Sequence, residues 1–160
     1  MKRYTIEIKW GLIFALMGLL WMGLERMIGL HDVHLAKHPI YTNFIAIPAI
    51  TIYVLGLLEK RKKHYGGKMS YGQGFRAGLF ITLVVTLLTP LTLWLTLAVI
   101  TPDFLSNARD FAIESGNMAQ EEAETYFSQG NYLVQGIVGA PIMGILTSAI
   151  VALFTRKREK

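Results

Sequence analysis

Four long apolar stretches occupy most of this chain of 160 residues, and they constrain its fold more than any other feature. A helix needs about 20 residues to cross a hydrocarbon layer roughly 30 Å thick. Stretches at about 10–30, 41–58, 77–100 and 132–154 reach that length or come close to it. Four such helices in a soluble domain would leave no amphipathic elements to enclose them. The sequence therefore predicts an all-α integral membrane protein, with four transmembrane helices in a single domain over residues 1–160.

Charged residues gather between the spans and alternate in sign, which predicts the orientation of the chain. Residues 59–76 hold six Lys and Arg against one Glu, whereas residues 101–131 hold one Arg against six Asp and Glu. Because Lys and Arg accumulate in short cytoplasmic connections, residues 59–76 and both termini are expected inside, and residues 101–131 outside. The terminal basic residues that support this are Lys2, Arg3, Lys9, Arg156, Lys157, Arg158 and Lys160.

The same placement of charge bears on the partners of the protein. The basic residues lie close to the ends of the spans, where anionic lipid headgroups attract them. Membrane lipids are therefore the expected partners of these residues, and nucleic acid is not. The absence of cysteine excludes disulfides and thiol chemistry.

The acidic segment 101–131 contains helix signals of its own. Residues 101–103, Thr-Pro-Asp, are typical of an N-cap, a first helical position and an acidic first turn, and Gly116 is expected to end that helix. A second short helix is expected to begin near Asn117 or Met118. We interpret the segment as an outer amphipathic helical lid between spans three and four, lying on the interface. A docking surface for an external partner is the alternative.

Small residues recur every four positions along the fourth span. Such a row forms a groove that another backbone can approach closely, and it is typical of helix packing in membranes. Through this face the chain is expected to meet another membrane protein or a second copy of itself. The row consists of Gly136, Ala140, Gly144, Ser148 and Ala152.

Proline and cap signals predict bends and beginnings of the spans. Pro48, Pro90 and Pro141 lie inside the second, third and fourth spans, so a bent four-helix bundle is expected. Ser70, followed three positions later by Gln73, is expected to form a capping box before the third span.

Threonines form a hydroxyl stripe beside the proline of the third span. Pro90 deprives the Thr86 carbonyl of its helical hydrogen bond, so nearby hydroxyls can bond the backbone locally. We interpret the stripe as part of a kinked helix whose threonine hydroxyls form hydrogen bonds within the helix and to a neighbouring one. A polar pore lining is the alternative. The residues of the kink and stripe are Thr82, Thr86, Thr89 and Pro90.

Three histidines just after the first span are the candidates for metal ligands. If the segment were helical, His31, His34 and His38 would follow the spacing i, i+3, i+7 and lie along one face. Gly29 and Pro39 border the segment and disfavour a continuous helix. Three readings stay open: a metal site, a pH-sensitive interface, and loop histidines without a special role.

The remaining chemistry argues against catalysis and coupled transport. Glu25 and Arg26 lie near the end of the first span, where we expect them to anchor the helix at the interface. The other three spans hold no Asp, Glu, Lys, Arg or His, which disfavours proton- or ion-coupled transport. No catalytic constellation and no cofactor are predicted. An interaction, scaffold or accessory subunit is the expected function, and a small flippase or channel for a lipid or small solute is the alternative.

Several motifs together resemble one known family. They are Tyr4 to Phe14, Gly29 to Asp32, His38 to Pro48, Lys68 to Phe75 and Met118 to Ala123. In these motifs the chain resembles a family of small four-span bacterial membrane proteins catalogued only as a domain of unknown function, and the likeness covers nearly its whole length.

The resemblance implies a multi-pass protein of the bacterial inner membrane. It also implies an accessory role beside a lipid-linked sugar glycosyltransferase. No catalytic or binding residues are implied. Met118 departs from the pattern, since a Ser or Thr cap is expected there, and this puts the start of one outer helix in doubt.

Overall fold

The computed structural model describes residues 4–157, so the predicted basic residues Lys2, Arg3, Arg158 and Lys160 lie outside the described residues. The described chain is almost entirely helical. Met69 and Lys157 pair in an isolated antiparallel β-bridge. The elements are α1 (Thr5–Met27), η1 (Leu35–Lys37), α2 (His38–Tyr41), η2 (Thr42–Ile45), α3 (Ala46–Lys63), α4 (Tyr71–Leu95), η3 (Thr96–Ile100), α5 (Phe104–Glu114), α6 (Gln120–Tyr126) and α7 (Gln129–Thr155).

Four helical segments are long and apolar enough to cross a membrane, which confirms the predicted all-α architecture. They are Thr5–Met27, Leu35–Lys63, Tyr71–Ile100 and Gln129–Thr155. At most 22% of the residues in the most apolar window of each segment are buried inside the protein. Large apolar side chains thus form the outside of the bundle, a surface that lipid covers in a membrane protein.

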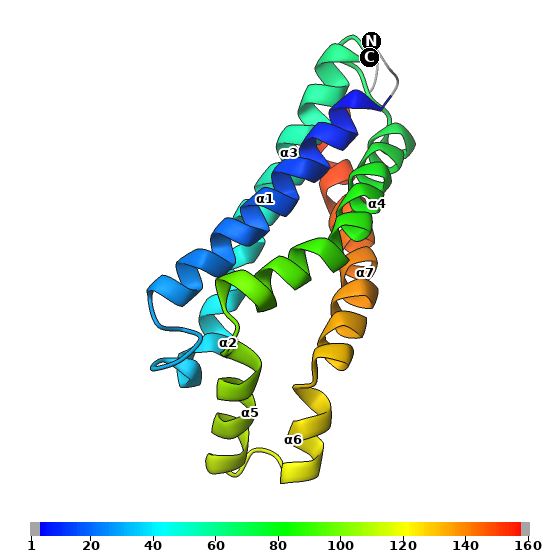
Figure 1. Cartoon of the computed structure of the whole chain (residues 1–160). Helices are drawn as coiled ribbons and strands as arrows, with labels where there is room; N and C mark the ends of the chain where they lie inside the picture. The colour runs from blue at the N-terminus through cyan, green and yellow to red at the C-terminus, as the bar shows by residue number, and fades with distance from the viewer. Residues whose placement is uncertain (1–3, 158–160) are drawn as a thin grey trace.

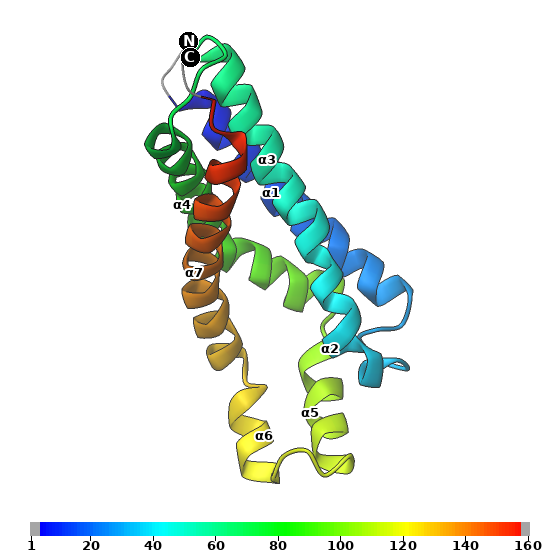
Figure 2. The same cartoon turned by 180° about the vertical axis from the view of Figure 1, so that it is seen from behind.

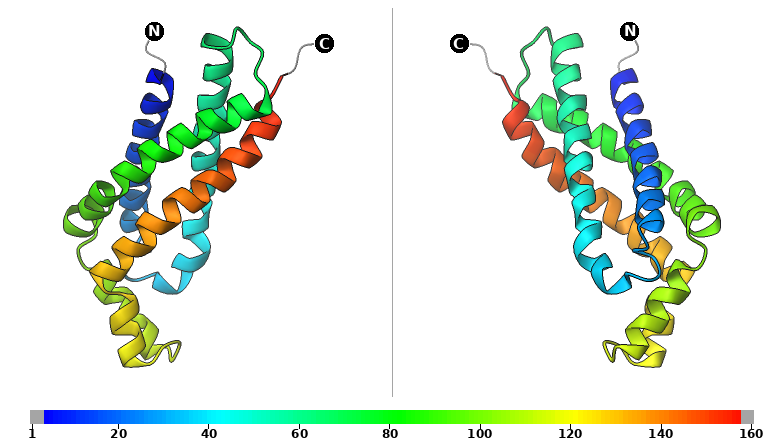
Figure 3. Two further views of the ribbon diagram at one scale, coloured as in Figure 1. Left: turned by 90° about the vertical axis from the view of Figure 1, so that its right-hand side faces the viewer. Right: turned by 90° about the vertical axis from the view of Figure 1, so that its left-hand side faces the viewer.

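The four long helices form two pairs that α4 connects. α1 lies beside α3, and α4 lies beside α7, while the second half of α4 crosses toward α1 (Figures 1 and 2). α1 begins and α7 ends at one end of the bundle, which we call the basic end because Lys60 to Lys63 and Lys68 also lie there. The hairpin formed by α5 and α6 extends from the opposite end, called here the hairpin end (Figure 3).

The row of small residues on α7 packs against α4 of the same chain. A Cβ atom added at Gly144 would lie 2.3 Å from Thr82 Cγ2, and one added at Gly136 would lie 2.4 Å from Leu93 Cδ1. On the facing helix, a Cβ atom at Gly78 would lie 2.6 Å from Ser148 Oγ. The predicted groove is therefore filled by α4.

The hydroxyls of α4 bond mainly to backbone groups near them. Thr89 Oγ1 donates to the Val85 carbonyl at 2.9 Å, and Thr82 Oγ1 donates to the Gly78 carbonyl at 3.0 Å. Thr86 Oγ1 is buried and has no hydrogen-bond partner among residues 4–157. α4 remains helical through Pro90 but bends toward the end of α1, and it continues into the π-helix η3 (Figure 1).

The helix boundaries follow some local signals and not others. Ser70 and Gln73 form the predicted capping box, with Gln73 N donating to Ser70 Oγ and Ser70 N donating to Gln73 Oε1. Gly116 has φ +69° and follows the end of α5 closely, as its predicted role as a stop requires.

Two predicted helix starts are wrong. Thr101 does not cap α5, because its N–H donates to the Thr96 carbonyl and completes η3, so the helix begins at Phe104. α6 begins at Gln120, because Met118 N donates to the Ala112 carbonyl and stays attached to the end of α5. The predicted second span, 41–58, lies within a longer helical segment, Leu35–Lys63, which also includes the short helices η1 and α2.

Candidate functional site

Three side chains with ligand atoms meet at the hairpin end of the bundle. Glu25 lies in the last turn of α1, His31 lies in the turn that follows, and His38 begins α2. Glu25 Oε2 is 3.0 Å from His31 Nε2 and 3.6 Å from His38 Nε2. One ligand atom from each residue lies within 4.8 Å of the others. Two imidazoles and one carboxylate are a donor set that binds zinc and related metals.

A glycine turn brings the first histidine back onto the helix that precedes it. Gly29 has φ +76°, a conformation that glycine adopts without strain. Leu30 N donates to the Glu25 carbonyl at 2.9 Å, and His34 N donates to the Gly29 carbonyl at 2.8 Å. This local pattern folds the chain over the end of α1, and it places the His31 ring beside the Glu25 carboxylate.

Neighbouring helices close the site. Trp21, one turn before Glu25, donates its indole N–H to Glu25 Oε1 at 2.5 Å. Asn107 of α5 donates its side-chain amide to the His31 carbonyl at 3.0 Å. The Phe104 ring lies 4.6 Å from the His31 ring and 5.1 Å from the His38 ring, measured between centroids. The carboxylate and the first imidazole are therefore fixed from three sides.

The burial of the three residues differs in a way that gives the site an open side. Glu25 is 1% exposed and His31 is 3% exposed, whereas the His38 side chain keeps 21% of its surface accessible. His31 Nδ1 is buried and has no hydrogen-bond partner within the described chain. Buried polar atoms usually have partners, so the hydrogen bonding of this site is incomplete as it stands.

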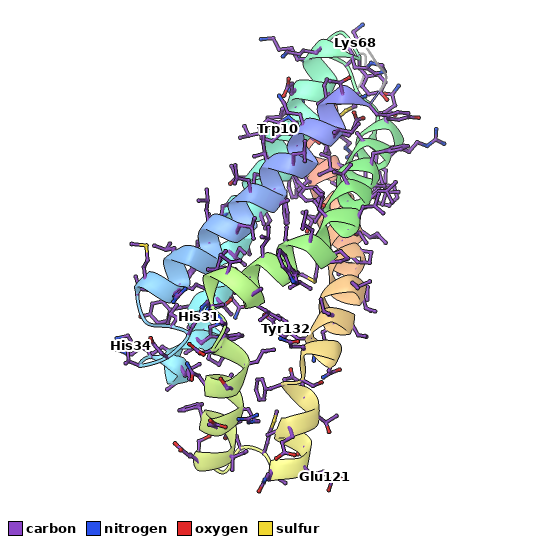
Figure 4. The ribbon with its side chains drawn as sticks, in the orientation of Figure 1. Trp10, His31, His34, Lys68, Glu121 and Tyr132 are labelled. Atoms are coloured by element: carbon purple, nitrogen blue, oxygen red, sulfur yellow. The ribbon has the colours of Figure 1, made fainter. Side chains whose placement is uncertain are left out.

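The structure brings together two of the three predicted histidines and leaves out the third. His34 is exposed and points away from the bundle (Figure 4). The segment is a turn followed by short helices, so the predicted spacing along one helical face does not apply. The predicted anchoring of Glu25 at the interface is wrong, because its carboxylate is buried against His31. The signal that could have found it is Gly29, which allows the chain to reverse between the two residues.

A recess of about 380 Å³ lies next to the histidine site, between α2, α5, α6 and α7. Its volume falls within the range of small-molecule sites. Apolar and aromatic side chains dominate its lining, and His38 contributes at one edge. The main aromatic residues of the lining are Phe104, Phe111, Tyr126, Phe127 and Tyr132.

The hairpin presents two chemically different faces. Its inner face buries apolar side chains against one another and against the bundle. Its outer surface carries all six acidic residues of segment 101–131, and each of them is exposed. Figure 4 shows one of them, Glu121, at the tip that lies farthest from Lys68. The six are Asp103, Asp110, Glu114, Glu121, Glu122 and Glu124.

At the basic end, ion pairs join the first helix to the third. Lys60 Nζ lies 2.7 Å from Glu7 Oε1, and both side chains are buried. Glu59 accepts a hydrogen bond from the Trp10 indole at 2.7 Å and forms an ion pair with Lys9. The sequence interpretation missed these pairs, since it assigned the basic residues to lipid headgroups.

Comparison with known proteins gives one match. A family model described as "Protein of unknown function (DUF4199)" matches residues 9–157. No curated protein and no solved structure matches the chain significantly. The matched region includes α1 from residue 9 onward, the other three long helices, the histidine site and the hairpin. The chain therefore belongs to the DUF4199 family.

Proposed function

We propose that this protein is a non-catalytic accessory subunit that binds another integral membrane protein through the α5–α6 hairpin. The observation that carries the proposal is the separation of the two faces of this hairpin. Its apolar face packs against the bundle, while its acidic residues are all exposed on the surface that extends beyond the long helices (Figure 3).

Charge complementarity defines the chemistry of the partner. Within the described part of the chain, the one ion pair on the hairpin joins Arg109 to Asp110. Among residues 4–157, the acidic residues of α6 form no ion pair, so within this part of the chain no direct partner neutralises their charge. Such a surface attracts a basic one and steers its approach. The partner therefore presents a Lys- and Arg-rich segment at the same membrane face. The alternation of charge along the sequence predicts that this face lies on the outer side.

The resemblance described above provides the first partner to test, a membrane enzyme that handles lipid-linked sugars. An accessory subunit beside such an enzyme needs no catalytic residues of its own. The scaffold role agrees with the lack of ionisable residues in the middle of the spans.

Site-specific photo-crosslinking in native membranes tests the proposal. A photoreactive amino acid at Gln120, on the exposed start of α6, is expected to crosslink to an integral membrane protein. Mass spectrometry of the adduct should place the contact in a basic segment outside the membrane. The triple variant Glu121→Lys, Glu122→Lys, Glu124→Lys should abolish the adduct, because it replaces attraction by repulsion.

The matched control changes charge at the opposite end of the molecule. Lys62→Glu alters an exposed residue of the basic end and should leave the adduct unchanged. The proposal is overturned if Gln120 crosslinks only to lipid, or if the adduct survives the triple charge reversal.

A flippase or channel is the second candidate function, and a recess between α1, α4 and α7 favours it. The recess has a volume of about 200 Å³, and Thr89, Thr92 and Thr96 are among the residues that line it. Flux of a solute or lipid in proteoliposomes would support this function if the double variant Thr89→Val, Thr92→Val abolished it. Vesicles that stay impermeable and do not scramble lipid would eliminate it.

A further inference from the structure

We propose that Glu25, His31 and His38 form a binding site for a divalent transition-metal ion of the zinc class. The proposal is independent of the hairpin's partner. It rests on the spacing of the three ligand atoms, on the groups that hold them, and on the burial of Glu25 and His31.

The spacing suits a small four-coordinate ion. Bonds of about 2.0–2.2 Å place neighbouring ligand atoms of a tetrahedral zinc site roughly 3.3–3.6 Å apart. The observed distances from Glu25 Oε2 to the two Nε2 atoms are 3.0 Å and 3.6 Å. Because no pair of ligand atoms exceeds 4.8 Å, a modest rotation of the imidazoles brings all three around one ion.

Surrounding groups hold the ligands in the way that metal sites require. Hydrogen bonds from neighbouring groups orient the side chains that bind a metal, and they tune the affinity of the site for the ion. Here the Trp21 indole donates to Oε1 of Glu25, whereas His31 faces Oε2. Oε2 is therefore left for the ion. Asn107 fixes the backbone of His31, and Phe104 packs against both imidazoles.

The burial of Glu25 and His31 points to a cation at their contact. Glu25 is 1% exposed, His31 is 3% exposed, and the Nε2 atom of His31 faces the carboxylate. The unpartnered Nδ1 is the other ring nitrogen and is not a ligand atom of this site. A metal ion on Nε2 gives this ring a reason to be buried beside a carboxylate, since the ion compensates the buried negative charge.

The donor set selects the class of metal. Two imidazole nitrogens and one carboxylate suit zinc, cobalt, nickel or copper, whereas calcium and magnesium prefer sites built from oxygen atoms. Three protein ligands leave a fourth position for water or another ligand. That position lies on the side of His38, the most accessible ligand, which also lines the apolar recess.

Metal titration of the purified full-length protein in lipid nanodiscs tests the proposal. After treatment with a chelator, the protein is titrated with Co²⁺, whose visible absorption reports four-coordinate geometry, and then with Zn²⁺ as a competitor. We expect one ion per chain, a visible Co²⁺ band that Zn²⁺ removes, and no displacement by excess Mg²⁺ or Ca²⁺.

Three variants identify the ligands. Glu25→Gln, His31→Ala and His38→Ala should each weaken binding by at least about tenfold and abolish the Co²⁺ band. His34→Ala is the matched control, because His34 belongs to the same segment but is exposed. Its affinity and spectrum should equal those of the wild type.

The variants remain informative even if one of them folds poorly. His38→Ala removes a side chain that is only partly buried, and circular dichroism of each variant shows whether its helices remain. Substoichiometric binding by the wild type overturns the proposal. Binding that survives His31→Ala combined with His38→Ala overturns it as well, and so does an equal loss in His34→Ala.

Discussion

Lys60 Nζ lies 2.7 Å from Glu7 Oε1 at the basic end, and the two side chains are 4% and 3% exposed. This contact joins the first turns of α1 to the last turns of α3. The second carboxylate oxygen of Glu7 has no partner among residues 4–157. A buried ion pair of this kind fixes the relative position of two helices while leaving each charge dependent on the other.

Removal of one partner should destabilise the protein more than removal of both. Glu7→Gln or Lys60→Met alone is expected to cost about 3–5 kcal/mol, because a buried charge loses its compensation. The double variant should recover most of that loss. The free energy of unfolding of each of the three variants is measured in mixed detergent micelles, with circular dichroism as the signal for loss of helix. Additive losses in the double variant would show that the two charges are independent.

The contact between α4 and α7 depends on glycine at the point where the helices are closest. A Cβ atom at Gly78 would lie 3.2 Å from the Ser148 Cα atom as well as close to its side chain, so the backbones must separate. Gly78→Ala is therefore expected to destabilise the bundle by about 1–3 kcal/mol. Gly139→Ala on α7 is the matched control, since nothing lies within 4 Å of its new Cβ atom.

The same unfolding measurement compares the two alanine variants. Alanine has a higher helix propensity than glycine, so Gly139→Ala should be neutral or stabilising. Equal stability of both variants would mean that α4 and α7 do not pack as closely as the structure shows.

Features that depend on nearby residues could be predicted from the sequence. The four spans follow from unbroken apolar stretches, and the capping box follows from Ser70 and Gln73 three positions apart. Gly116 ends a helix because it adopts a positive φ, which its identity indicated. The start of α5 could not be predicted from its cap motif, because Thr101 is bonded to the preceding π-helix.

The candidate metal site needed three-dimensional information. The sequence identified His31, His34 and His38 by their residue type, but it could not show which of them meet, because the segment is a turn and short helices and not one continuous helix. Glu25 joins them because a glycine turn reverses the chain, and α5 closes the site from a distant part of the sequence. The pair Glu7 and Lys60 was missed for the same reason, since hydropathy does not show which helices are neighbours.

The orientation predicted from charge can be tested by cysteine labelling, because the natural chain contains no cysteine. Glu121→Cys lies on the hairpin, and Lys62→Cys lies at the basic end; both positions are exposed. A membrane-impermeant maleimide should label the first in cells with a permeabilised outer membrane and the second only after lysis. Labelling of both positions from the same side would contradict the four-span arrangement, in which the hairpin and the basic end lie on opposite sides of the membrane.

Trp21 offers a test of whether the proposed metal site is preorganised. Trp21→Phe keeps an aromatic ring but removes the N–H that donates to Glu25 Oε1, so the carboxylate loses one of the groups that orient it. Loss of such a second-shell hydrogen bond typically lowers metal affinity by about 10–100-fold. We expect a reduction of this size in Zn²⁺ affinity, measured by competition with a chromophoric chelator, and a Co²⁺ spectrum that keeps its four-coordinate form. Trp94→Phe is the control, because Trp94 is 59% exposed and lies on a different helix. Unchanged affinity in Trp21→Phe would show that the indole supports the fold of α1 without contributing to the ion's site.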